Sequence, residues 1–207
     1  MSLKGRSVVI TSGPTREHLD PVRYMTNASS GRMGAALASA ALRAGARVTV
    51  VAGPGAPVPA GARALPVVTA LDMRRRTLAA SRRADVVIAA AAVGDWRFAS
   101  VSPRKVRRSP RGLTVRLVPN PDIVADVARR RRAGRPYVVG FALETHDWLE
   151  HAAEKLRRKR LDLVVANEAS ALGGERTRVA LVDADGALVL APMSKARAAA
   201  AVIRRVA

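Results

Sequence analysis

The feature that most constrains the fold of this sequence is the alternation of short, continuous apolar runs with segments of helical periodicity. The apolar run at residues 7–10 is followed by a helical segment at 30–43, and then by the apolar run "ARVTVVAG" at 46–53. Gly45 lies where the C-cap of that helix is expected. Short apolar runs of this kind are typical of strands buried on both faces. The order strand, helix, strand predicts a parallel pair with a right-handed crossover.

The same alternation continues toward the C-terminus. Further helices are predicted at residues 69–80, 120–132 (with Asn120 as N-cap and Pro121 at the first position), 147–160 and 194–206, and further strands at 84–93, 137–143 and 161–167. Residues 179–192 read as a hairpin with Asp185–Gly186 as its turn. The sequence therefore predicts an α/β fold over one domain, residues 1–207, with a Rossmann-like, doubly wound, mainly parallel sheet and an antiparallel C-terminal edge.

Residues 96–118 interrupt this pattern. The stretch "RFASVSPRKVRRSPRG" has two prolines, many charges and little apolar periodicity, and "LTVRLV" then alternates like a strand that is exposed on one face. We expect this segment to form an extended, mobile flap.

The charge of the chain raises the question of a nucleic-acid partner. Lys and Arg number 36 against 16 Asp and Glu, which gives a net charge of +20. Such a surface attracts phosphates, and a basic nucleic-acid-binding module remains an alternative function. However, 31 of the 36 basic residues are Arg, and aromatic residues make up only 3%, which leaves little for stacking bases. We therefore expect no specific nucleic-acid partner.

Other absences narrow the chemistry. The chain has no cysteine, so disulfides, thiolate metal sites and cysteine nucleophiles are excluded. His18, His146 and His151 show no metal-ligand spacing. No run of ~18 uncharged apolar residues and no signal peptide is found, so we expect a cytoplasmic protein without a membrane partner.

The predicted topology also locates the site. In doubly wound sheets ligands bind beyond the carboxyl ends of the strands, which here are followed by Gly13, residues 91–95, Phe141 and Asn167. The segment "NASSG" then begins a helix, where an anion is favoured; alternatively its serines are only N-caps. Neither "SGPT" nor "SSGRMG" matches G-x-G-x-x-G, which argues against an NAD(P)-binding oxidoreductase, the other alternative function.

A resemblance to a known family rests on several longer motifs. The strings "ITSGPTREHLDPVRYMTNASSGRMG", "AAAVGDW", "PRKVRR", "NPDIV", "VVGFALET" and "LDLVVAN" occur in this order. In order and spacing they resemble phosphopantothenoylcysteine synthetase, or phosphopantothenate–cysteine ligase, of coenzyme A biosynthesis. The resemblance runs from about Leu3 to the final helix. Because the flavin-dependent decarboxylase that precedes this domain in many members is absent here, we expect a free-standing synthetase or a synthetase domain expressed alone.

The resemblance implies a two-step, Mg²⁺-dependent ligation. The carboxylate of 4′-phosphopantothenate attacks the α-phosphate of CTP, and the amine of L-cysteine then displaces CMP. ATP is the alternative nucleotide. The resemblance also implies a homodimer, in which the flap closes over the neighbouring subunit's site, and a separate decarboxylase as a partner.

The resemblance assigns roles to matching positions. Asn27 would donate its amide to the developing oxyanion, Arg23 would support the cysteine step, and Lys105 in the flap would hold the triphosphate. Asp95 would contact the ribose or the base edge. The remaining nucleotide-binding positions are Gly13, Ser29, Ser30, Gly31, Ala91, Asn120, Pro121, Asp122, Phe141, Lys155 and Lys159. The metal ligands are left unassigned, since the triphosphate is expected to hold most of the Mg²⁺.

The scarcity of lysine supports three of these positions independently. Only five of the 36 basic residues are Lys, and three of them are Lys105, Lys155 and Lys159. A compact ammonium and a guanidinium are not interchangeable, so these lysines indicate a chemical requirement, although an exposed helix face alone explains the last two equally well. Two positions depart from the family pattern: Arg107 and Arg108 replace lysines, and Gly94 replaces an alanine.

Overall fold

The computed structural model describes residues 2–144, 146–168 and 176–207. Its main sheet has eight strands in the order β13-β12-β10-β9-β6-β1-β4-β5. In chain order their bounds are β1 Ser7–Ser12, β4 Arg47–Ala52, β5 Arg63–Pro66, β6 Val86–Ala89, β9 Tyr137–Glu144, β10 Leu163–Glu168, β12 Val179–Asp183 and β13 Gly186–Val189. The six strands from β5 to β10 pair in parallel, whereas β12 and β13 pair antiparallel at one edge. This confirms the predicted fold class.

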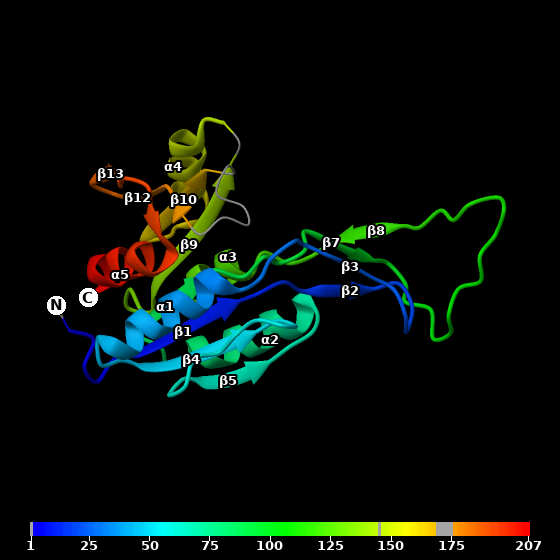
Figure 1. Cartoon of the computed structure of the whole chain (residues 1–207), viewed down its shortest axis with the longest axis horizontal. Helices are drawn as coiled ribbons and strands as arrows, with labels where there is room; N and C mark the ends of the chain where they lie inside the picture. Colours follow the sequence, from blue (N-terminus) through cyan, green and yellow to red (C-terminus); the bar gives the residue numbers. More distant parts are fainter. Residues whose placement is uncertain (1, 145, 169–175) are drawn as a thin grey trace.

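Helices cover both faces of the sheet (Figure 1). They are α1 Arg32–Arg43, α2 Ala70–Ser81, α3 Ile123–Arg130, α4 Trp148–Lys159 and α5 Lys195–Val206. On one face α1 and α5 pack on side chains such as Ile10, and on the other α2, α3 and α4 pack on side chains such as Val9. Successive side chains of a strand point to opposite faces, so each buried strand contributes to both cores.

The ends of α1 and α2 follow their sequence signals. Gly45 has φ +87°, and its N–H donates to the Leu42 carbonyl while the Ala46 N–H donates to the Ala41 carbonyl. This pair of bonds is a Schellman motif, so Gly45 ends α1 as predicted. Thr69 and Asp72 form a capping box at the start of α2.

Two local predictions are wrong. The N-cap of α3 is Asp122, whose carboxylate accepts from the Ala125 N–H, and not Asn120. The Asn120 side chain instead donates to the Gly94 carbonyl in the loop after β6. In the C-terminal hairpin Asp183 pairs with Gly186, so the two-residue turn is Ala184–Asp185 and not Asp185–Gly186. Gly186 already belongs to β13.

An arm projects from the sheet (Figure 1). It combines two hairpins, β2 Arg16–His18 with β3 Tyr24–Thr26, and β7 Trp96–Phe98 with β8 Leu117–Pro119. The extended character predicted for residues 96–118 agrees with this arrangement, but only Leu117 and Val118 of "LTVRLV" lie in a strand. A third short pair, β11 Arg176–Thr177 with β14 Met193–Ser194, lies before α5.

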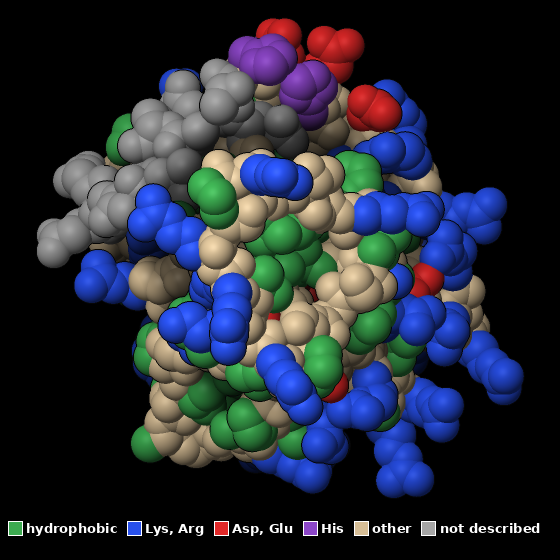
Figure 2. Space-filling view, turned by 90° about the vertical axis from the view of Figure 1, so that its right-hand side faces the viewer, with side chains coloured by type: hydrophobic (Ala, Val, Ile, Leu, Met, Phe, Trp, Pro, Cys, Tyr) green, Lys and Arg blue, Asp and Glu red, His purple; other side chains and the backbone are tan. Residues whose placement is uncertain are grey.

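None of the helices in the described part of the chain has both the length and the apolar character that a bilayer span requires. Seen from the side of the arm, Lys and Arg side chains are spread over the surface and acidic side chains are few (Figure 2).

Candidate functional site

A pocket of about 260 Å³ lies at the carboxyl edge of the parallel strands. The strand order reverses direction between β1 and β6, and ligands bind at this switch point in doubly wound sheets. The pocket is lined by the segment before and within the first turn of α1, the loop after β6, the end of β9, and three single residues: Ala28, Ser29, Ser30, Gly31, Arg32, Met33, Gly34, Ala90, Ala91, Ala92, Phe141, Ala142, Leu143, Asn167, Thr177 and Lys195.

Glycines let α1 approach the end of β1 closely. A Cβ on Gly34 would lie 2.2 Å from the Ser12 Oγ, so only glycine fits there. The Ser12 hydroxyl donates to the Gly31 carbonyl at 3.2 Å. In Rossmann sheets the third glycine of the fingerprint allows the same helix–strand contact. Here residues 14–30, which contain β2 and β3, separate Gly13 from that contact, so the usual glycine spacing is lost.

The start of α1 is open to the pocket. Its N-cap is Gly31 with φ 69°, and no side chain within the described residues caps its N–H groups. The Ser29 hydroxyl accepts from the Gly31 N–H at 3.4 Å, and Gly31 is itself the N-cap. The alternative interpretation of Ser29 or Ser30 as the N-cap is therefore wrong. Uncapped N–H groups at a helix start favour an anion in this pocket.

Two further residues give the pocket its polar character. The Oδ1 of Asn167 is buried and has no hydrogen-bond partner among the described residues. Such an oxygen is costly unless a ligand donates to it. Lys195, the first residue of α5, also lines the pocket. Sequence analysis placed Asn167 at a strand end without a role and missed Lys195.

A cluster of amides adjoins the pocket at the loop after β6. The Asn27 side chain donates to the Val93 carbonyl at 3.0 Å, and the Asn120 side chain donates to the Gly94 carbonyl at 2.8 Å. The Asn120 backbone N–H also donates to the Asp95 carbonyl. Three segments far apart in the sequence therefore meet here, and the predicted residues Asn27, Asp95 and Asn120 come together.

The predicted lysines of α4 contact strand β9 and the start of α3. The Lys159 ammonium lies 2.6 Å from the carboxylate of Asp122, and the Lys155 ammonium donates to the Phe141 carbonyl at 2.6 Å. Burial alone would raise the pKa of Asp122, but the hydrogen bonds from Lys159 and the Ala125 N–H outweigh it and lower that pKa. Lys155 thus reaches the strand that lines the pocket, whereas Lys159 is held by Asp122. Pro121, the residue directly before Asp122, is partly buried.

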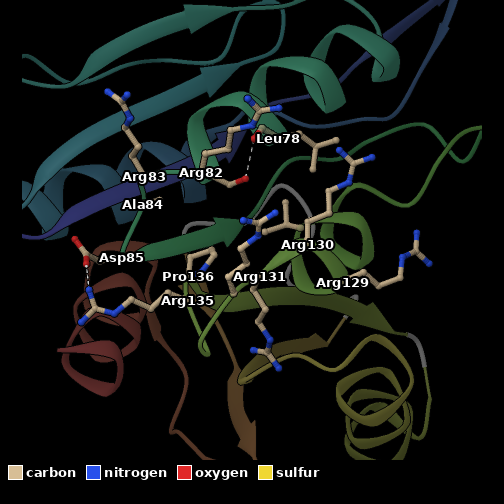
Figure 3. A pocket seen from close by; sticks show the side chains of 13 residues that line it. Leu78, Arg82, Arg83, Ala84, Asp85, Arg129, Arg130, Arg131, Arg135 and Pro136 are labelled. Atoms are coloured by element: carbon tan, nitrogen blue, oxygen red, sulfur yellow. Dashed lines mark hydrogen bonds and ion pairs between the residues drawn. The ribbon is translucent and has the colours of Figure 1, made fainter.

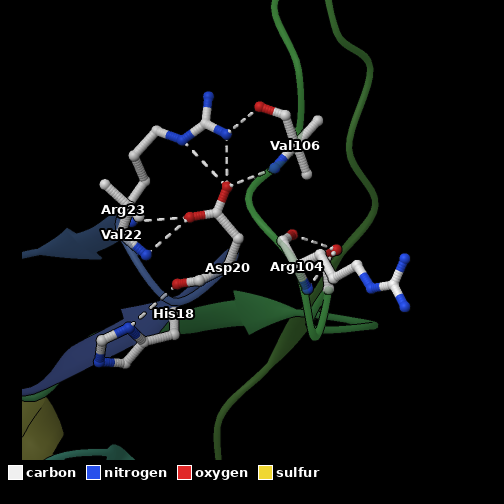
Figure 4. A network of polar contacts seen from close by, with 7 residues as sticks. His18, Asp20, Val22, Arg23, Arg104 and Val106 are labelled. Carbon is white, nitrogen blue, oxygen red and sulfur yellow. Dashed lines mark hydrogen bonds and ion pairs between the residues drawn. The ribbon is translucent and has the colours of Figure 1, made fainter.

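Arg23 lies elsewhere, on the arm, beside Arg104 and Val106, which flank Lys105 in the chain (Figure 4). The buried carboxylate of Asp20 accepts from the Arg23 side chain and from the N–H groups of Val22, Arg23 and Val106. Arg23 also donates to the Val106 carbonyl at 2.6 Å. The ion pair with Arg23 is the main cause that holds the pKa of Asp20 well below its ordinary value. Lys105, next to Val106, is exposed.

The arm therefore separates two groups of predicted residues. Four extended residues span about 13 Å, so Arg23 at the arm's turn lies far from Asn27 at its base. Within one chain the structure does not bring Arg23 and Lys105 to the pocket. The carboxylate of Asp20, to which sequence analysis assigned no role, fixes the backbone beside Lys105.

Taken together, the strand order and the pocket define a doubly wound α/β protein with a ligand site at its switch point. The family follows from comparison with known proteins. Residues 3–207 match the family described as the DNA/pantothenate metabolism flavoprotein C-terminal domain, and the chain belongs to this family.

The relatives include large bifunctional proteins. The chain is 49% identical over 172 residues to the coenzyme A biosynthesis bifunctional protein CoaBC of Escherichia coli (strain K12), a match that covers 81% of this chain and 42% of the relative. It is 42% identical over 200 residues to CoaBC of Vibrio parahaemolyticus, covering 93% of this chain and 50% of the relative. The chain thus spans no more than about half the length of these relatives.

Solved structures agree in fold. The crystal structure of the C-terminal domain of CoaBC matches with a TM-score of 0.85 and 33% identity, covering 98% of this chain and 94% of that one. A Cab2 mutant in complex with phosphopantothenate-cysteine matches with a TM-score of 0.81 and 20% identity, covering 97% and 85%. At that identity the second match supports the fold alone.

Proposed function

We propose that this chain is a phosphopantothenate–cysteine ligase of coenzyme A biosynthesis that uses CTP. The observation that carries the proposal is the meeting, at one sheet edge, of an anion-accepting helix start with the amide cluster of Asn27 and Asn120. Such a site can hold a nucleotide beside a reacting acyl group. The 49% identity to CoaBC of Escherichia coli supports the substrates.

The proposed reaction has two steps. The carboxylate of 4′-phosphopantothenate attacks the α-phosphorus of CTP, which forms an acyl-cytidylate and releases pyrophosphate. The amine of L-cysteine then attacks the acyl carbon, the amide bond forms, and CMP leaves. Both steps concentrate negative charge, so positioned N–H donors and ammonium groups stabilise the transition states.

Each element contributes a part of this stabilisation. In our proposal Asn27 donates to the oxyanion of the acyl group, and the first turn of α1 with Ser29 and Ser30 binds phosphate. Phe141 packs on the base, and the Oδ1 of Asn167 accepts from an exocyclic amino group. Cytosine and adenine both carry such a group, so the choice of CTP over ATP rests on the relatives and on the assay below.

The lysines and the remaining predicted residues complete the nucleotide site. Lys155 is 2.6 Å from the Phe141 carbonyl, so a small rotation brings its ammonium to the phosphates. Lys159 is paired with the carboxylate of Asp122, so it can bind a phosphate only after this ion pair breaks. Gly13 and Ala91 bring the backbone close to the ligand, Asp95 contacts the ribose or the base edge, and Asn120 and Pro121 line the nucleotide.

Mg²⁺ fits this site as an ion held mainly by the substrate. No group of three His, Cys, Asp or Glu side chains gathers among the described residues. Mg²⁺ commonly binds through one or two carboxylates together with substrate phosphates. Asp95 supplies an exposed carboxylate at the same edge. When bound, the ion would neutralise charge on the triphosphate.

The arm supports a homodimer in which each site is completed by the neighbouring subunit. Seven large apolar side chains on or beside the arm are exposed: Val22, Tyr24, Trp96, Val101, Leu113, Val115 and Leu117. Exposed apolar groups of this kind mark an interface. In our proposal the arm carries Lys105 and Arg23 into the partner's site. A separate decarboxylase as a further partner and a cytoplasmic location are also proposed.

The deciding assay measures pyrophosphate release from CTP. We expect release to require 4′-phosphopantothenate, and turnover to phosphopantothenoylcysteine to require L-cysteine. Release that is independent of 4′-phosphopantothenate would reject the proposal. Parallel reactions with ATP test the nucleotide. A fluorescence titration with NADPH tests the oxidoreductase alternative, and oligonucleotide binding tests the nucleic-acid alternative.

A further inference from the structure

A second hollow lies at the opposite edge of the sheet, where the parallel strands begin (Figure 3). Its volume is about 950 Å³. It is bounded by the end of α2, the turn into β6, the end of α3 and the turn into β9. Seven arginines line it: Arg82, Arg83, Arg129, Arg130, Arg131, Arg132 and Arg135.

The charges of this hollow are not balanced. Three of the arginines have acidic partners: Arg129 pairs with Asp126, Arg131 with Asp162 at 2.8 Å, and Arg135 with Asp85 at 3.0 Å. Asp85 is the one acidic residue of the lining, and it also accepts from the Ser7 N–H.

The other four arginines are Arg82, Arg83, Arg130 and Arg132. None of them has an acidic partner within the described ranges, and all four are exposed. They come from two separate segments of the lining: two directly follow α2, and two lie at and just after the end of α3. Like charges held around a concave surface repel one another, and such a surface concentrates anions.

The arrangement indicates the kind of anion. A guanidinium donates bidentately to phosphate oxygens, and guanidinium groups from two segments of a wide hollow suit several linked phosphates better than a single one. Four of the thirteen lining residues are apolar, namely Leu78, Ala84, Val127 and Pro136, against seven arginines. A ligand recognised mainly through its charge fits this lining.

This hollow is distinct from the pocket at the carboxyl edge. Pro136 lines the former and Leu143 the latter, and both lie at or beside the same strand, β9. Seven extended residues separate them by roughly 23 Å. A ligand in one site therefore leaves the other accessible.

We propose that the arginine-lined hollow between the ends of α2 and α3 is a second anion site, which binds a chain of linked phosphates. Inorganic tripolyphosphate and the phosphate tail of a nucleotide share this chemistry. The proposal does not depend on the ligase reaction, because none of the hollow's residues belongs to the carboxyl edge.

The test is a calorimetric titration of tripolyphosphate into the full chain saturated with CTP. We expect one remaining site in the wild type. The double variant Arg82→Gln/Arg130→Gln removes one unpartnered guanidinium from each segment and should weaken that site about tenfold or more. The control Arg47→Gln/Arg63→Gln removes the same charge from exposed positions outside the hollow and should bind like the wild type. ATP in place of tripolyphosphate, at equal or higher affinity, would identify a nucleotide tail as a second source of the ligand.

Three results would overturn the proposal: no tripolyphosphate site beside CTP, equal weakening in both double variants, or binding of oligonucleotides alone. Thermal melts check folding, and the hollow variant should melt no lower than the wild type because it loses charge repulsion. Failure of CTP itself to bind would count against the ligase proposal only, since the two double variants would still differ in their affinity for tripolyphosphate.

Discussion

At the residue scale, Asn27 offers the most direct test of the proposed chemistry. Its amide is anchored to the Val93 carbonyl at 3.0 Å, so its position beside the site is defined. Asn27→Asp replaces the amide donor with a negative charge where negative charge develops. We expect kcat for ligation to fall by about 10²–10³-fold, the usual cost of losing an oxyanion donor. CTP affinity should change little. Rapid-quench assays of acyl-cytidylate formation measure the effect, and wild-type turnover would exclude the proposed role.

Asp20 is predicted to act through Lys105 without touching substrate. Its carboxylate accepts from the Val106 N–H at 3.0 Å and from Arg23, so it fixes the backbone next to Lys105. Asp20→Asn should lower kcat/KM for CTP by about tenfold or more, since small misplacements have such effects. In a Lys105→Gln background the same change should add little. Asp185→Asn, at an exposed turn, is the matched control. Additive losses in the double variant would show that Asp20 acts independently of Lys105.

The carboxylate of Asp20 also makes the free energy of unfolding depend on pH. Arg23 lowers the pKa of Asp20 in the folded chain, below its ordinary value of 3.8. The stabilisation is therefore complete at neutral pH and is lost as the pH falls from about 3.8 toward the lower folded-state pKa. Urea denaturation at pH 7 and pH 3 measures the free energy of unfolding of the wild type and of Asp20→Asn. The difference between the two free energies should be smaller at pH 3 than at pH 7. A difference that widens would contradict this assignment.

At the scale of elements, the contact between α1 and β1 depends on Gly34. A Cβ there would lie 2.2 Å from the Ser12 Oγ, so Gly34→Ala must push the helix away from the strand. We expect destabilisation of about 1–3 kcal/mol, as for other overpacked sites, together with weaker CTP binding. Thermal melts and calorimetry measure the two effects. Normal stability of this variant would show that α1 can shift without cost.

Gly94 provides the contrasting substitution. A Cβ at this position would meet the Trp96 carbonyl at 3.4 Å and the Glu17 Cγ at 3.5 Å, which is ordinary contact. Gly94→Ala should therefore be tolerated, and it should raise stability by about 0.4–1 kcal/mol because the unfolded chain loses freedom. A loss of CTP turnover with unchanged melting would instead indicate that the site uses the backbone freedom of glycine.

Sequence periodicity predicted the helices and strands of the buried cores and missed the partly exposed strands. Each long strand and helix of the two cores was recognised, because continuous apolar runs and caps such as Gly45 are local signals. The strand β5 and the hairpin of β2 and β3 were missed, since their side chains are partly exposed and their apolar pattern is weak. Asn120 was misplaced as a cap because two possible N-caps, Asn120 and Asp122, lie two residues apart.

The candidate site was predicted in its parts but not in its assembly. Strand ends located Phe141 and Asn167, and the family motifs pointed to Asn27 and Asn120. No local pattern could indicate that Lys195 returns to the pocket from the last helix, because that contact joins distant segments. The network of Asp20 was equally hidden, since an isolated acidic residue before a proline gives no sign of its partners.

At the scale of the whole molecule, the position of the arm predicts complementation between subunits. Lys105→Gln disables the arm and Asn27→Ala disables the sheet edge. If each site takes its arm from the partner, mixed dimers contain one intact site, and an equal mixture should recover about a quarter of wild-type turnover in a two-fold symmetric dimer. Activity after mixing and re-equilibration measures this. No recovery would show that each chain supplies its own arm.

The exposed apolar side chains of the arm also have a consequence for how the proposed dimeric ligase would work at different concentrations. In a single chain Tyr24 and Trp96 are exposed to water. Dimer formation would therefore bury apolar surface that remains exposed after the chain has folded. Turnover per chain should then decline on dilution, once dimers dissociate, and supply of the product would respond to how much of the protein a cell makes.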